Sequence, residues 1–253
     1  MPLRVSPWAQ LVPLLTIIWN DFIAEAGDIS IWSPDVVNVK VKDNTFTGPG
    51  GTTSGVAIEP AGATGTSAIS RNTISGYGTG VWILSGGPAG GTTEVSGLTI
   101  SDNPISGCAK GITLGHTSVT SDMTAITITR NTLSSNTVGL SVGNCTYVKA
   151  DEFVITSNNF LLNTTGLENL NALQVTAECN YWGSADGPGG VGPGSGDLVS
   201  ANGDSATAER LEIESIHRFQ VGNSCLLIAG TRCIFICQRY PCPGCVSRYP
   251  IIG

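Results

Sequence analysis

The stretch Ile128-Thr-Arg-Asn131-Thr-Leu133 decides the fold, because closely related hexapeptides occur five times along the chain. Each copy has an aliphatic residue, two polar residues, an Asn, one variable residue and then a hydrophobic residue. The Asn residues of the five copies are Asn44, Asn72, Asn103, Asn131 and Asn158, at spacings of 28, 31, 28 and 27. A repeat of this length is typical of a solenoid, in which each unit buries its apolar face only against its neighbours.

A second signal divides each repeat into short strands. In four copies a Gly follows 11 residues after the first aliphatic residue and opens another hydrophobic run, as Gly111 does; in the first copy the Gly slips to Gly55. Within the runs, segments such as Ala125-Ile-Thr-Ile-Thr129 alternate apolar and polar residues, which is the period of a half-buried strand. We therefore predict an all-β fold, a right-handed parallel β-helix (solenoid) of about five to six coils with capping termini.

The repeated Asn is expected to have a structural role. Asn tolerates a left-handed backbone at a sharp corner, and its amide both donates and accepts hydrogen bonds, so we predict a ladder of stacked Asn side chains. The preceding residues are expected to stack opposite charges along one outer edge, with about 0–1 kcal/mol from each exposed pair. A catalytic role for this column remains an alternative. The column consists of Asp43, Arg71, Asp102, Arg130 and Ser157.

The last repeat is followed by a recognisable segment, Cys179-Asn180-Tyr181-Trp182-Gly183-Ser184-Ala185-Asp186-Gly187-Pro188. With the preceding repeats, it resembles the right-handed parallel β-helix repeat proteins of the pectate-lyase-like superfold, whose secreted and surface members commonly end in an Asn-aromatic-Trp-Gly…Gly-Pro motif. The resemblance covers about residues 35–200 and implies a fold and a terminal cap, but no single activity. The two aromatic residues are expected to cover the last coil, with sugar stacking as the alternative. The expected cap comprises Asn180, Tyr181, Trp182, Gly183, Gly187 and Pro188.

The two ends of the chain differ from this body. We interpret residues 1–34 as a signal peptide or an N-terminal cap, because Arg4 precedes an apolar stretch and Ala24-Glu25-Ala26 has a small-x-small pattern. The apolar stretch is too short, and too interrupted by Pro13, for a transmembrane helix. Residues 35–200 are the predicted β-helix with its terminal motif, and residues 201–253 are a Cys-rich tail.

The cysteines give no clear metal signature. Five of the eight lie in the last 29 residues, and because no His accompanies them, disulfides in an oxidising compartment are favoured over a zinc site. We predict no metal. The other three, Cys108, Cys145 and Cys179, are expected to be small buried hydrophobes. The tail cysteines are Cys225, Cys233, Cys237, Cys242 and Cys245.

Catalytic groups are sparse. The chain has no Asp-Asp pair and only two His residues, so the paired-carboxylate constellation of a glycoside hydrolase is incomplete. For a polysaccharide lyase, which needs a positioned base, the candidates are Lys110 and Arg130 with Asp102, and calcium would be a cofactor only in that case. The neighbouring hydroxyls Thr99 and Ser101, and Thr127 with Thr129, resemble the Thr-x-Thr faces of β-helical ice-binding proteins, although Thr also simply suits exposed strand positions.

The net charge of −7 disfavours nucleic acid as a partner, because phosphate binding needs a basic surface. We therefore predict an extracellular or cell-surface β-helix module that is carbohydrate-binding or structural and adhesive, without cofactor, transmembrane segment or evident catalytic site. Its expected partner is a polysaccharide or cell-surface glycan. The alternatives are a polysaccharide lyase or glycoside hydrolase, and an ice-binding β-helix; the oligomeric state stays open.

Overall fold

The computed structural model divides the chain into two compact units, residues 1–210 and residues 211–253. All of its described elements are β-strands. It contains no described helix long and apolar enough to span a membrane. The described residues are 3–4, 15–24, 28–33, 35–50, 55–85, 94–115, 121–143, 145–146, 153–171, 175, 177–190, 194–201, 217–221, 224–229 and 233–238.

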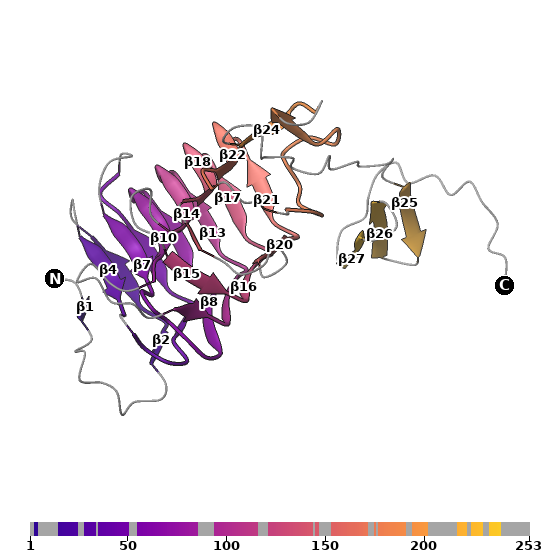
Figure 1. Cartoon of the computed structure of the whole chain (residues 1–253). Coiled ribbons are helices and arrows are strands. Elements are labelled where there is room, and N and C mark those ends of the chain that lie inside the picture. Colours follow the sequence, from indigo (N-terminus) through magenta and orange to yellow (C-terminus); the bar gives the residue numbers. More distant parts are fainter. Residues whose placement is uncertain are drawn as a thin grey trace. The chain divides into compact units, whose positions relative to one another are not determined.

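The first unit winds through three long sheets and one short sheet, and all its strand pairs are parallel. Successive coils place their strands side by side, as the colour gradient along the stack in Figure 1 shows. The predicted all-β, right-handed parallel β-helix is confirmed. Sheet 1 has nine strands, in the order β1 (Leu3–Arg4), β4 (Ile29–Trp32), β7 (Val56–Glu59), β10 (Thr79–Ile83), β14 (Lys110–Leu114), β18 (Val138–Val142), β22 (Thr165–Asn169), β24 (Gly196–Ala201) and β23 (Pro188–Gly190).

The other two long sheets have six strands each, and the repeated hexapeptide supplies one strand to each of them. Sheet 2 contains β2 (Thr16–Ile18), β5 (Lys40–Lys42), β8 (Ser67–Ser70), β12 (Leu98–Ser101), β16 (Ile126–Thr129) and β20 (Phe153–Thr156). Sheet 3 contains β3 (Asp21–Ile23), β6 (Thr45–Thr47), β9 (Thr73–Ser75), β13 (Pro104–Ser106), β17 (Thr132–Ser134) and β21 (Asn159–Leu161). The short sheet contains β11 (Val95–Ser96), β15 (Ser121–Thr124) and β19 (Cys145–Thr146).

The core consists of columns of aliphatic and aromatic side chains, one from each coil. Because residues alternate between the two faces of a strand, the central residue of each sheet 3 strand points inward. These side chains are fully buried and stack in register: Phe46, Ile74, Ile105, Leu133 and Phe160. Aromatic rings extend the column at both ends, with ring centroids 4.7 Å apart for Phe22 and Phe46 and 4.4 Å apart for Phe160 and Trp182.

The coils begin before residue 35, because β2, β3 and β4 already pair within the long sheets. At the other end, the two aromatics of the terminal segment behave differently. Trp182 is 1% exposed and lies over the last core ring, whereas Tyr181 is 46% exposed. Trp182 therefore closes the end of the core, and Tyr181 presents its side chain to solvent.

The second unit contains a three-stranded antiparallel sheet of β25 (His217–Val221), β26 (Ser224–Ala229) and β27 (Cys233–Gln238). Its register places Cys225 opposite Cys237. The Cys242-Pro-Gly-Cys245 segment lies outside the described residues.

Candidate functional site

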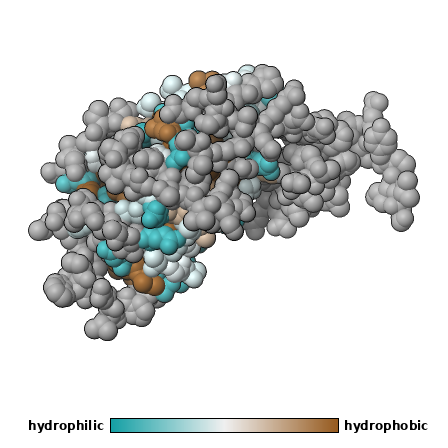
Figure 2. Space-filling model, in the orientation of Figure 1, coloured by the Kyte–Doolittle hydropathy of each residue, from teal (hydrophilic) through white to brown (hydrophobic). Residues whose placement is uncertain are grey.

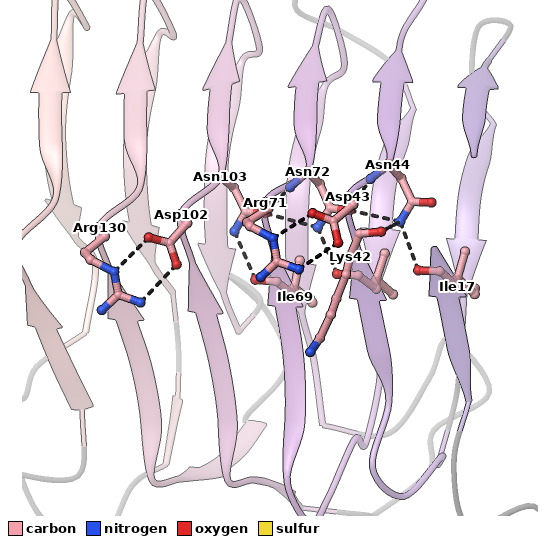
Figure 3. A network of polar contacts seen from close by, with 11 residues as sticks. Ile17, Lys42, Asp43, Asn44, Ile69, Arg71, Asn72, Asp102, Asn103 and Arg130 are labelled. Atoms are coloured by element: carbon pink, nitrogen blue, oxygen red, sulfur yellow. Dashed lines mark hydrogen bonds and ion pairs between the residues drawn. The ribbon is translucent and has the colours of Figure 1, made fainter. Parts of the chain in front are cut away.

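A continuous ladder of Asn side chains lies at the corner between sheets 2 and 3. Each Asn donates its backbone N–H and its Nδ2 to the Oδ1 of the next; Asn72, for example, donates to Asn103 Oδ1 over 2.9 and 3.0 Å. Each Nδ2 also donates to a backbone carbonyl, as Asn103 does to Ile69 O over 3.0 Å (Figure 3). Two further residues extend the ladder beyond the five repeat positions, Asn20 at the start and Asn180 in the terminal segment.

The residue before each Asn, and not the Asn itself, adopts the left-handed backbone. The φ angles of Asp43, Arg71, Asp102, Arg130 and Ser157 lie between 55° and 60°. The expectation that the Asn supplies the left-handed conformation is therefore wrong. The left-handed residue turns the chain so that its own side chain points to water, while the next residue directs its amide inward toward backbone carbonyls.

This left-handed column carries two bidentate ion pairs (Figure 3). The Arg71 guanidinium donates to Asp43 over 2.6 and 2.7 Å, and that of Arg130 donates to Asp102 over 2.7 and 2.9 Å. The hydrogen bond from Arg130 lowers the pKa of the Asp102 carboxyl. The two Arg side chains are exposed, whereas the side chain of Asp43 is 15% exposed and that of Asp102 is 38% exposed.

The three lyase candidates are not brought into one site. Arg130 and Asp102 are bound to each other at the corner of sheets 2 and 3. Lys110 instead begins β14 of sheet 1, where its ammonium donates to Ser141 Oγ over 3.0 Å and lies 3.5 Å from Glu168 Oε2. The sequence pattern could not separate these positions, because it fixed the repeat but not which strands share a sheet.

The outer face of sheet 3 is a grid of hydroxyl groups. The residues on either side of each inward core residue form two registered columns along the stack. Between β6 and β21 none of these outward residues is ionisable, and Tyr181 pairs with Asn159 at the end of the first column. One column holds Thr45, Thr73, Pro104, Thr132 and Asn159, and the other holds Thr47, Ser75, Ser106, Ser134 and Leu161.

Sequence reasoning missed this grid because it examined the residues around the aliphatic position before the Asn. Those residues form the outer face of sheet 2. There Thr99 and Thr127 are in register, but the next strands on either side place Ala68 and Val154 at this position, so the row of hydroxyls is only two residues long. Ser101, the neighbouring position, is 6% exposed. The Thr-x-Thr or Thr-x-Ser pattern after the Asn, as in Thr132-Leu-Ser134, was the available signal for the longer face.

A third polar column follows the outward positions of sheet 1. At its far end, Ser141 Oγ donates to Glu168 Oε2 over 2.9 Å and accepts from Lys110, so its polar groups are satisfied. Near its start, Glu59 is 2% exposed and its Oε1 has no hydrogen-bond partner. Burial raises the pKa of this carboxyl to about 7. The registered column runs Arg4, Trp32, Glu59, Trp82, Thr113, Ser141, Glu168 and Ser200.

The described residues contain no group of three His, Cys, Asp or Glu side chains that could hold a metal ion. Cys108 is a buried free thiol whose pKa is raised to about 11 by burial. Cys179 is disulfide-bonded, so the expectation that it is a small buried hydrophobe is wrong. His116 lies outside the described residues.

Comparison with models of protein families matches residues 14–187 to the family described as "Periplasmic copper-binding protein (NosD)". The match begins just before β2 and ends within the terminal segment, so it spans the stacked coils and more than half of the chain. No curated protein and no solved structure matches the chain.

Proposed function

Because the chain belongs to the NosD family, whose description is periplasmic copper-binding protein, we propose that it is a periplasmic β-helix module that binds a neutral polysaccharide without cleaving it. The envelope location follows the family. The ligand class follows from one observation, the hydroxyl grid on the outer face of sheet 3.

Hydroxyl side chains suit a sugar polymer because each one can donate and accept, as a sugar hydroxyl does. On sheet 3 the second column holds a hydroxyl on four consecutive coils, whereas Pro104 interrupts the first column; neighbouring strands are about 4.8 Å apart. An extended polymer lying along the stack therefore meets at least one hydroxyl at most of the coils. Solenoids commonly use such extended surfaces for binding.

An aromatic residue lies at one end of this surface and an acidic residue lies at the other. Tyr181 is exposed where the first column ends, and an aromatic face packs against the apolar face of a sugar ring. Asp21 on β3 is the ionisable residue at the opposite edge. With a chain net charge of −7, this favours a neutral polymer over a uronic-acid polymer.

The residues described in the structure do not fit a copper centre. Copper is held by Cys, Met and His ligands; among the described residues no His, Cys, Asp and Glu side chains gather into a group of three, and the free thiol of Cys108 is buried without such neighbours. We therefore derive no step through copper. The lyase alternative has no supporting geometry either, because Arg130 is bound to Asp102 and Lys110 lies on another sheet with partners of its own.

The proposal is tested by retention on insoluble cellulose, chitin and starch, with binding then quantified on soluble fragments of the retained polymer. We expect the double variant Thr73→Val and Thr132→Val, and separately Tyr181→Ala, to lose retention. The matched control Thr127→Val, on the outer face of sheet 2, should bind as the unmodified protein does.

Three results would contradict the proposal. Retention unchanged in both sheet 3 variants would exclude this face. Inhibition of ice recrystallisation that the sheet 3 variants abolish, with no polysaccharide retained, would make ice the partner. Formation of unsaturated sugar from pectate, alginate or chondroitin would instead support the lyase alternative.

A further inference from the structure

The outer face of sheet 1 holds a carboxylate between two indoles. The register pairs Trp32 with Glu59, and Trp82 occupies the next position of the same column. Glu59 is 2% exposed, and its Oε1 has no hydrogen-bond partner. A buried acceptor without a donor lowers the stability of the fold, and a charged one lowers it more.

On the two strands that pair with β7, no residue offers Glu59 a compensating charge; the nearest basic residue in the register is Arg4 on β1, which pairs with Trp32 and not with Glu59, and whose side chain lies outside the described part of the structure. The strands on either side, β4 and β10, contain no ionisable residue in Ile29–Trp32 or Thr79–Ile83. The nearest polar network in the column, that of Ser141, Lys110 and Glu168, is complete without Glu59. Within the described part of the chain, Glu59 Oε1 therefore has no partner that would explain a carboxylate at this position.

We propose that Glu59 and its two flanking indoles form a binding site for an organic ammonium ion that carries at least one N–H group. Indole faces attract cations, and a carboxylate oxygen that lacks a donor supplies the complementary hydrogen bond. The unsatisfied Oε1 selects an ammonium with an N–H over a quaternary one, because only the former can donate. This site lies on a different sheet from the hydroxyl grid and does not depend on it.

Access to the carboxylate requires one indole to turn aside. The Trp82 Nε1 donates to Gly115 O over 2.9 Å, which holds this indole beside Glu59. Binding exchanges this hydrogen bond to a carbonyl for one between an ammonium and a carboxylate. The second is the stronger, because both of its partners are charged.

Protonation sets the pH range of the site. Burial raises the pKa of the Glu59 carboxyl to about 7, so the carboxylate needed for binding forms above neutral pH. An alkylammonium stays charged throughout this range, because its pKa lies near that of Lys. Affinity is therefore expected to rise between pH 5.5 and pH 8.

Isothermal titration of the full chain with cyclohexylammonium, and with cyclohexanol as the uncharged probe of similar shape, tests the site. We expect saturable binding of the ammonium alone, stronger at pH 8 than at pH 5.5. Glu59→Gln should weaken it by about tenfold or more, as expected for a lost charge-assisted hydrogen bond. Glu168→Gln, which removes a carboxylate already bound to Lys110 and Ser141, should leave it unchanged.

Tetramethylammonium separates the two parts of the site, because it retains the cation and lacks the N–H. It should bind more weakly than cyclohexylammonium. The proposal is overturned if cyclohexanol binds equally well, if Glu59→Gln retains the affinity while folding normally by circular dichroism, or if no saturable binding occurs at pH 8.

Discussion

The Asn ladder and the Glu59 column are both rows of polar side chains repeated from coil to coil, but they differ in hydrogen bonding. Asn103 uses its Oδ1 and its Nδ2 in four hydrogen bonds, to Asn72, Asn131 and Ile69. Glu59, equally buried, leaves Oε1 without any. The first arrangement stabilises the solenoid, whereas the second costs stability and is therefore the better indicator of a function.

The largest effect on stability is expected from removing an Asn side chain in the middle of the ladder. We expect Asn103→Ala to lower the free energy of unfolding by about 3 kcal/mol, because it leaves the Asn72 N–H buried without its acceptor and removes the hydrogen bonds to Ile69 O and Asn131 Oδ1. Urea unfolding followed by far-ultraviolet circular dichroism measures the change. The control is Asn159→Ala, an exposed Asn whose side chain makes one hydrogen bond of 3.4 Å. Equal losses in the two variants would mean that the ladder has no special role.

Replacing Glu59 is expected to have the opposite effect and to raise the free energy of unfolding above neutral pH. Its folded-state pKa of about 7 exceeds the ordinary value of 4.5, so the folded protein holds the proton more tightly than the unfolded chain does. Stability is therefore full below pH 4.5 and falls by about 2–3 kcal/mol as the pH rises to about 7. Glu59→Gln should flatten this dependence and be more stable than the unmodified protein at pH 8. Unfolding titrations at pH 4.5 and pH 8 measure it; a fall that persists in Glu59→Gln would assign it to another group.

A smaller effect distinguishes satisfied from unsatisfied hydroxyls within the sheet 1 column. Thr113 Oγ1 is buried without a partner, whereas Ser141 Oγ bridges Lys110 and Glu168. We expect Thr113→Val to stabilise the protein by about 1 kcal/mol and Ser141→Ala to destabilise it by a similar amount. Thermal melts of the two variants check the signs, and a destabilised Thr113→Val would contradict this assignment.

The sequence predicted the features that depend on the repeat and missed those that depend on neighbouring sheets. Asn72 and Asn103 could be placed in one column because a coil-to-coil period fixes their register. Glu59 could not be placed, because it lies outside the repeated hexapeptide and the next residue of its column, Trp82, follows after 23 positions, which is shorter than any of the repeat spacings. The pattern groups Lys110 and Arg130 as lyase candidates from consecutive coils, but Lys110 lies on sheet 1 and Arg130 lies at the corner between sheets 2 and 3.

At the corner between sheets 2 and 3, too, the sequence predicted the feature but not the residue that forms it. The pattern indicated a turn at each Asn, but only the backbone shows that Arg71 or Asp102 takes the left-handed conformation. The hydroxyl grid could have been recognised in the sequence, because Thr73 and Ser75 flank a core residue. The number of coils over which it extends becomes clear only from the register of the strands from β6 to β21.

The smallest expected effect belongs to the ion pairs outside the ladder. Arg130 and Asp102 have ideal bidentate geometry, yet their side chains are 60% and 38% exposed, so water already solvates both charges. A double-mutant cycle with Asp102→Ala and Arg130→Ala should give a coupling energy of about 0–1 kcal/mol, and 1 M salt should reduce it because the pair is screened. The cycle is measured by urea unfolding at low and high salt. A coupling that approaches the effect of Asn103→Ala, or that salt does not weaken, would show that the outer column holds the coils together as strongly as the buried ladder does.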